Sequence, residues 1–180
     1  MVDRVDEERR QALTEAQSAL LEKYSYQIHH GFHGSYEHGL DAKGRMIVPA
    51  AFRPMLGERF YICPTPDFKA VAIYPSLEWE LYYCSLLEKL ERDARMERIV
   101  NRFTKYTYED CECDAQGRIL LPAKLRARFL QDARDVEVSG ATTHIRIMRA
   151  EDALAEEERF DREIPDVRAY EAEILGRPQV

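Results

Sequence analysis

The sequence predicts an α+β fold made of two related units, with helices between them and after the second. Three observations lead to this prediction. One motif occurs twice, short stretches of strand character surround each copy, and longer stretches with helical spacing follow each unit. The chain has 180 residues, 45% of them apolar, which is enough for one sizeable core or two small ones. Two units favour two small cores.

The repeated motif is 13 residues long. It is DAKGRMIVPAAFR at residues 41–53 and DAQGRILLPAKLR at residues 114–126, so each residue lies 73 positions from its counterpart. Seven of the 13 positions are identical, whereas unrelated segments would agree at roughly one position in fifteen. The chain therefore contains an internal repeat.

Each copy predicts a strand, a tight turn, a second strand and a short helix. In each turn the aspartate can bond to its own backbone and the glycine supplies a positive φ, so the chain should reverse there as a hairpin. The turn-forming residues are Asp41, Gly44, Asp114 and Gly117. Eight residues after each aspartate, Pro49 and Pro122 suit the first position of a helix, where the missing N–H costs nothing.

An arginine follows each turn glycine, and a second one lies on each short helix. Arg45 and Arg118, at the start of the strands, are suited to gripping an anion such as a phosphate or a carboxylate. The alternative is a salt bridge between each turn arginine and the aspartate of the same turn, which would only lock the turn. One copy of the motif does not decide between these two roles.

Residues 1–31 begin with a charged stretch and continue as one amphipathic helix, because apolar residues recur at steps of three and four. These residues are Leu13, Ala16, Leu20, Leu21 and Tyr24. The apolar stripe is narrow, so this helix is expected either to dock on the body or to stay partly ordered. The three histidines of His29-His30-x-x-His33 suggest a metal site, but a polar linker is the preferred interpretation, since no acidic or cysteine partner lies close by in sequence.

The other elements are expected in the same order in both units. Strands are expected at residues 35–40, 60–63, 69–74, 108–113, 135–139 and 144–148. Helices are expected after Pro75 and at residues 94–106, 122–129 and 150–160. Ser76 should cap the first of them, Pro165 should end the last, and Asp166 can cap one more short helix. Cys111 and Cys113 share one face of a strand, where buried thiols pack as small hydrophobic groups.

The motifs resemble those of the MraZ family of transcriptional regulators, which have two AbrB-like (SpoVT-AbrB) repeats. The resemblance rests on the two motifs in register, on Gly34-x-Tyr36-x-His38-x-Leu40 before the first, and on Ile73-Tyr74-Pro75-x-x-x-Trp79 between the units. It extends over residues 34–160 and leaves out the first thirty or so. It implies two tandem swapped-hairpin repeats that form a split β-barrel with linking and C-terminal helices.

The resemblance also implies a function. A protein of this family is expected to bind double-stranded DNA sequence-specifically at the promoter of the division and cell-wall gene cluster, as a ring-shaped homo-oligomer in the cytoplasm, associated with the nucleoid. Six basic residues become candidates for DNA contact: Lys43, Arg45, Arg53, Arg118, Lys124 and Arg126. Lys43 corresponds to the uncharged Gln116 in the second copy. Because it carries one more positive charge, the first turn is expected to bind DNA more strongly than the second.

The resemblance and the element pattern together suggest five segments. They are an N-terminal extension, partly helical, at 1–33, a first SpoVT-AbrB repeat at 34–80, linking helices at 81–108, a second repeat at 109–152, and an acidic helical appendage at 153–180. Units of this size are marginal alone and carry open strand edges, so pairing between repeats or subunits is expected.

The overall charge argues against a nucleic-acid binder, because the formal net charge is −7 and the pI is about 5.3. The charge is uneven, however. Residues 151–173 include three consecutive glutamates and few bases, whereas residues 98–134 are locally basic. The basic residues of that segment are Arg98, Arg102, Lys105, Arg118, Lys124, Arg126, Arg128 and Arg134. This asymmetry is compatible with a DNA-facing surface between solvated acidic ends.

Other function classes find little support. No stretch reaches the roughly 18 apolar residues of a membrane helix, and the charged start lacks the apolar region of a signal peptide. Four cysteines are expected to remain thiols, and Cys111-x-Cys113 lacks zinc-site spacing. The sequence has no recognisable nucleophile turn or glycine-rich phosphate loop. We therefore expect no enzyme, catalytic residue, cofactor, bound metal, membrane contact or small-molecule substrate.

The main alternative to a DNA-binding regulator is a protein-assembly or antitoxin-type module. AbrB-like folds also occur in antitoxin subunits, in which the hairpins dimerise and a tail binds a protein partner. The acidic C-terminal helices could serve as such a tail.

Overall fold

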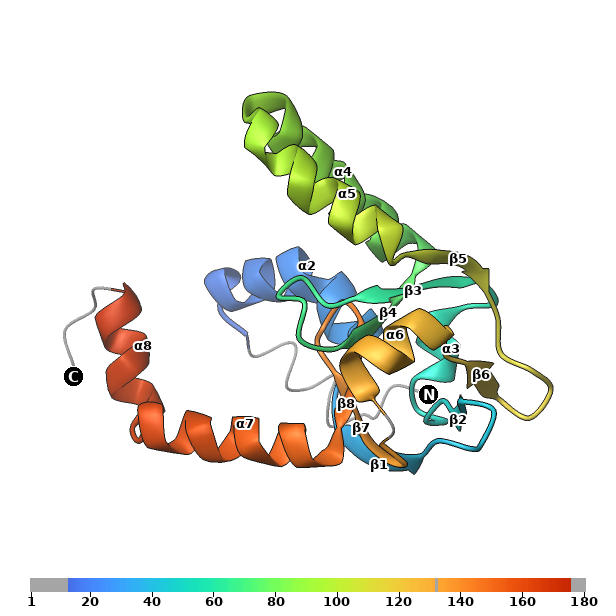
Figure 1. The fold of residues 1–180 in the computed structure, drawn as a ribbon. Helices are drawn as coiled ribbons and strands as arrows, with labels where there is room; N and C mark the ends of the chain where they lie inside the picture. The colour runs from blue at the N-terminus through green and yellow to red at the C-terminus, as the bar shows by residue number, and fades with distance from the viewer. Residues whose placement is uncertain (1–12, 132, 176–180) are drawn as a thin grey trace.

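A computed structural model describes residues 13–131 and 133–175 of the chain (Figure 1). Six strands of this part form one antiparallel sheet in the order β1-β7-β8-β4-β3-β5. Their bounds are β1 Ser35–Gly39, β3 Phe60–Pro64, β4 Val71–Pro75, β5 Tyr108–Cys111, β7 Asp135–Gly140 and β8 Ile145–Arg149. Each predicted strand is present, with ends that differ by at most two residues. The mixed helix and strand content confirms the α+β class.

The two units are interleaved within this sheet. The first strand of the first unit, β1, pairs with β7 of the second, and the first strand of the second unit, β5, pairs with β3 of the first. The main core draws apolar side chains from both units, among them Phe52 and Ile62 from the first and Leu125 and Ile147 from the second. The two units therefore share one main core and do not bury one each.

A separate ribbon of two short antiparallel strands joins the two copies of the motif. It consists of β2 Arg45–Ile47 and β6 Arg118–Leu120, with Met46 opposite Ile119. The predicted chain reversal at each turn is confirmed, but the hairpin pairing is wrong, because β1 and β2 each pair with a strand of the other unit. The chain reverses at a turn closed by its own hydrogen bonds, such as Gly44 N–H to the Asp41 carbonyl (2.8 Å), and the flanking strands then diverge.

The short helix after each ribbon strand starts later than predicted. In the first unit the Phe52 N–H donates to the Pro49 carbonyl, which makes a turn before helix α3 (Arg53–Leu56). In the second unit Pro122 is the N-cap of α6 (Ala123–Leu125), which continues as a π-helix, η2 (Arg126–Leu130). Gly57, at φ 80°, ends α3.

Two helices between the units form an arm that extends from the sheet (Figure 1). Helix α4 spans Ser76–Arg92, and α5 spans Glu97–Lys105 after a short 3-10 turn, η1, at Ala94–Met96. Trp79 fixes the base of the arm, since its ring stacks on Tyr61 and on Phe103 at centroid distances of 5.2 and 5.1 Å. Ser76 is not the predicted cap. It is the first helical residue, and its hydroxyl donates to the Arg59 carbonyl instead.

The predicted N-terminal helix is α2, Glu15–His30, which starts with a capping box between Thr14 and Gln17. It does not bury an apolar face, because large side chains such as Leu20 and Ile28 remain about half exposed. The charged start, residues 1–12, lies outside the described residues. His29 and His30 form the last turn of α2, so the interpretation of this stretch as a polar linker is wrong for these two residues. The described residues contain no group of three or more potential metal ligands.

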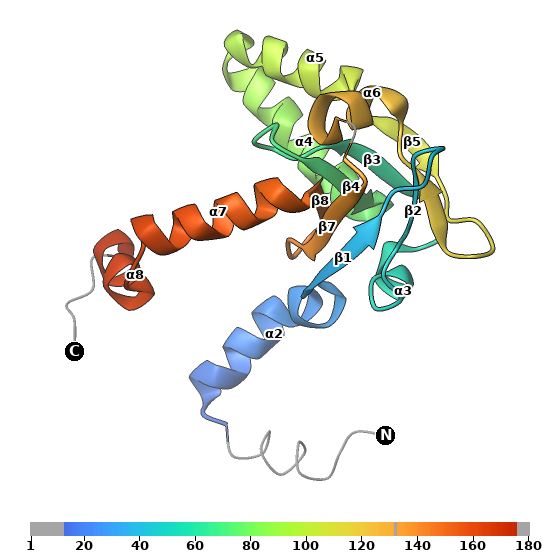
Figure 2. The same ribbon diagram turned by 60° about the horizontal axis from the view of Figure 1, so that its bottom comes forward.

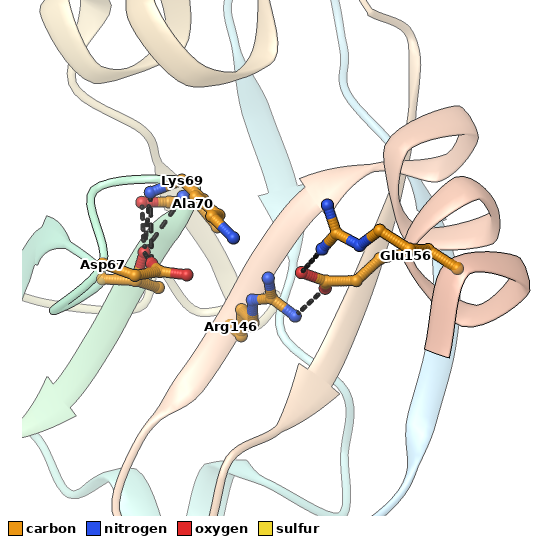
Figure 3. A network of polar contacts seen from close by, with 7 residues as sticks. Asp67, Lys69, Ala70, Arg146 and Glu156 are labelled. Carbon is orange, nitrogen blue, oxygen red and sulfur yellow. Dashed lines mark hydrogen bonds and ion pairs between the residues drawn. The ribbon is translucent and has the colours of Figure 1, made fainter. Parts of the chain in front are cut away.

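The C-terminal helices leave the body as an extended arm (Figure 2). Helix α7 spans Ala150–Glu163, and α8 (Val167–Leu175) is capped by Asp166 as predicted. Ion pairs hold the start of α7 on the sheet. Arg146 of β8 pairs with Glu156 at 2.5 Å, as Figure 3 shows, and Arg149 pairs with Asp152 at 2.6 Å. Part of the acidic charge of α7 is therefore neutralised inside the subunit.

The cysteines remain thiols. Cys63 is buried, and Cys111 and Cys113 are partly buried against the main core, which agrees with packing, although β5 ends at Cys111 and Cys113 lies beyond it. Among the described helices none has the length and apolar character needed to cross a membrane.

Candidate nucleic-acid interface

In the first turn, hydrogen bonds to the Asp41 carboxylate fix the orientation of Arg45. One carboxylate oxygen of Asp41 accepts hydrogen bonds from the backbone N–H groups of Lys43 and Arg45, both at 2.9 Å, and the other accepts from Arg45 Nε at 2.7 Å. The Arg45 backbone bond and the guanidinium lower the pKa of Asp41 to about 2. Because the carboxylate is charged at neutral pH, it attracts the guanidinium and orients it. The arginine side chain meanwhile stays partly exposed.

The second turn repeats this geometry. Asp114 accepts from the N–H groups of Gln116 and Arg118 at 2.9 Å and from Arg118 Nε at 2.8 Å. The hydrogen bond from the Arg118 side chain is the main cause of the lowered pKa of Asp114. The turn roles predicted for the aspartates and glycines agree with these bonds and with φ values of 79° at Gly44 and 73° at Gly117.

The salt bridge considered as an alternative role for the turn arginines is present in both turns. The side chains of Arg45 and Arg118 nevertheless remain 33% and 30% exposed. Each guanidinium donates to its own aspartate from Nε, and Arg118 Nη2 also lies 2.7 Å from Asp114. Part of both guanidinium groups therefore stays open to a ligand.

The helix arginines lie against the turns of the opposite unit. Arg53 Nε donates to the Val48 carbonyl at 2.9 Å, and a Cβ atom added to Gly117 would overlap the Arg53 guanidinium. In the same way Arg126 Nε donates to the Leu121 carbonyl at 3.0 Å, and its guanidinium occupies the space beside Gly44. Both arginines therefore support a turn, a role that the sequence pattern did not indicate.

The ribbon places the turn arginines on one outward face. Met46 and Ile119 point into the core at 1% exposure, so the residues on either side of them face outward. These outward residues are Arg45, Ile47, Arg118 and Leu120. Ile47 and Leu120, which the sequence analysis did not single out, are 45% and 60% exposed. Their position two residues after each turn arginine was the available signal, but only the strand register shows which face is free.

The other candidate residues lie around the first turn and on the second short helix. Lys43, at the tip of the first turn, and Lys124, on α6, are both exposed. An open hollow of about 510 Å³ adjoins the first turn and is lined in part by Arg126 and Arg134. The structure thus gathers Lys43, Arg45 and Arg126 at the first turn, and Arg53 and Arg118 at the second.

Comparison with known proteins agrees with the repeat. The family model described as "MraZ protein, putative antitoxin-like" matches residues 31–103 and 107–161. The chain belongs to the MraZ family. The MraZ match includes both turns and the ribbon, and it leaves out the whole of α2 and of α8.

Similar proteins carry the same family name. A protein named transcriptional regulator MraZ from Desulfitobacterium hafniense (strain DSM 10664 / DCB-2) is 39% identical over 119 residues, which cover 64% of this chain and 79% of the relative. Another from Thermoanaerobacter sp. (strain X514) is 39% identical over 120 residues, or 66% of this chain and 80% of the relative. The names of these MraZ proteins refer to regulation of transcription. They agree with the prediction that the chain is not an enzyme.

Proposed function

We propose that this MraZ-family protein is a sequence-specific DNA-binding transcriptional regulator. The observation that carries the proposal is the outward face of the β2–β6 ribbon, on which two arginines are oriented by the aspartates of their own turns. A two-stranded ribbon fits the major groove of double-stranded DNA. An arginine whose side chain is already fixed loses less conformational entropy when it binds.

The candidate residues take different parts in this contact. Arg45, whose side chain is one-third exposed, presents its guanidinium to guanine O6 and N7 or to a phosphate. Lys43 beside it provides a point charge for a phosphate. Arg53, Lys124 and Arg126 contact phosphates from the sides of the ribbon. Arg118 makes the equivalent contact from the second turn. The first turn, with Lys43 where the second has Gln116, is therefore the main DNA contact.

The assembly belongs to the same proposal. We interpret the interleaved units as two swapped-hairpin repeats of a split β-barrel, with the segment boundaries given above. The protein acts as a ring-shaped homo-oligomer on the promoter of the division and cell-wall gene cluster, in association with the nucleoid. The described sheet ends in two edge strands, β1 and β5, and open edges favour contact with further copies. Genome-wide crosslinking of the tagged protein tests the target, and an absence of enriched sites would reject the regulator.

Binding is expected to require several adjacent copies of a short DNA element. One ribbon offers few contacts with DNA, and the net charge of the subunit is negative, so a single subunit should bind one element weakly. Linked subunits bind neighbouring elements at a high effective concentration. Affinity should therefore rise steeply from one to four elements in a gel-shift series at fixed salt. Equal affinity for all four probes would contradict the role of the oligomer.

The second candidate function is a protein-assembly or antitoxin-type module. It is favoured by the C-terminal arm, which carries exposed apolar side chains such as Leu154, Phe160 and Ile174. In this case the acidic arm binds a protein partner and the turns serve assembly.

Shortening the arm separates these functions, and the structure indicates where to cut. Removal of residues 157–180 keeps Glu156 bound to Arg146 and keeps Ala153 packed on Ala70 and Met148. The deleted part has seven acidic and four basic residues, a net charge of −3. Non-specific DNA binding should tighten, and more so at low salt, because the Debye length grows from about 8 Å at physiological salt to about 30 Å at 0.01 M. Light scattering is the control: a smaller oligomer that binds less DNA would make the arm an assembly element.

A further inference from the structure

The outward face of the ribbon has an apolar component that phosphate binding does not explain. Arg45 lies opposite Leu120, and Ile47 lies opposite Arg118. Basic and apolar side chains therefore alternate both along each strand and across the pair of strands. Ile47 and Leu120 are exposed while their neighbours Met46 and Ile119 are buried. The two occupy equivalent positions of the repeat, 73 residues apart, which makes the pattern a property of both copies.

We propose that Ile47 and Leu120 recognise the C5-methyl groups of thymines in the major groove. The inference rests on the proposed DNA binding and adds a source of base specificity to it. Thymine is the only base of DNA with a methyl group in the major groove, and apolar side chains contact it there. On this ribbon the arginines supply polar contacts and the two apolar side chains supply the methyl contacts.

The ribbon geometry also sets a spacing. Ile47 and Leu120 are diagonal neighbours on one face, and such pairs are roughly 7–8 Å apart. Successive bases of one strand are about 3.4 Å apart along the helix axis. The two recognised methyl groups should therefore lie about two base-pair steps apart in each element.

The flanking charges favour DNA over a second copy of the chain as the occupant of this face. A protein partner that covered Ile47 and Leu120 would also cover Arg45 and Arg118, whose Asp partners already lie in the same turns. Burial of such charges is unfavourable unless the partner supplies acidic groups. The sugar-phosphate backbone beside the groove supplies negative charge on both sides of the bases.

The test compares thymine with uracil, which pairs identically and lacks only the methyl group. The probe is a short duplex carrying the most enriched sequence from selection of a random library with the full chain, made with thymine or with deoxyuridine. Wild-type protein should bind the thymine duplex about 4-fold more tightly for each methyl contact. The Ile47→Ala/Leu120→Ala variant should lose this preference and bind the uracil duplex as the wild type does. Leu154→Ala, which changes an exposed leucine of α7, should keep the preference.

The outcomes separate the inference from the proposed function. Specific binding of the selected duplex with no difference between thymine and uracil leaves the regulator in place and overturns the inference. A double variant that keeps the full preference also overturns it. A double variant with a smaller mass by light scattering would place Ile47 and Leu120 in a subunit interface, which overturns the inference as well. Single-residue variants of Ile47 and Leu120 provide the same comparison if the double variant does not fold.

Discussion

Arg45→Ala is expected to weaken specific DNA binding at least about 100-fold while the fold and the oligomer remain intact. A bidentate contact between an arginine and a guanine contributes about 1–3 kcal/mol to discrimination, and the loss multiplies when several subunits bind together. The Arg45 side chain is one-third exposed and outside the core, so the free energy of unfolding should change by less than about 1 kcal/mol. Gel shifts with a selected operator and thermal melting provide the two measurements.

Arg118→Ala is the matched control, because it removes the equivalent side chain from the second turn. It should weaken binding less than Arg45→Ala, since the second turn carries Gln116 where the first carries the cationic Lys43. If the Asp41–Arg45 pair is structural instead, the Arg45 variant should melt several degrees lower and keep its DNA affinity once folded.

Gly44→Ala is expected to reduce the free energy of unfolding by about 2–3 kcal/mol. Gly44 has a φ of 79°, a conformation that costs other residues about 1–2 kcal/mol. In addition, a Cβ at this position would displace the Arg126 guanidinium and break its hydrogen bond to the Leu121 carbonyl, a loss of about 1 kcal/mol. Urea unfolding at one fixed protein concentration measures the loss, since stability of an oligomer depends on concentration.

Arg126→Ala tests the cause of this loss. It removes the overlapping guanidinium, so Gly44→Ala should cost at least about 1 kcal/mol less in the Arg126→Ala background than in the wild type. An equal cost in both backgrounds would mean that φ alone matters and that the contact between the units at Gly44 contributes nothing. The pair Gly117→Ala and Arg53→Ala repeats the test at the second turn.

Much of the local structure followed from the sequence because its causes are local. An aspartate that accepts from the next backbone N–H groups and a glycine at positive φ define each turn within five residues, as Asp41 to Arg45 illustrate. The cap at Asp166 has the same local origin. The start of α4 shows the limit, since Ser76 forms its hydrogen bond with Arg59, 17 residues away.

What the sequence determined by itself is the repeat, the turn chemistry, the family, and the residue types that could bind an anion. Only the tertiary structure decided which strands pair, because main-chain hydrogen bonds between strands are equally available to either unit and the shared core selects the interleaved arrangement. The same packing directs Arg53 and Arg126 to the opposite turns. It also leaves Ile47 and Leu120 facing outward, since burial of Met46 and Ile119 fixes the face of a strand whose side chains alternate.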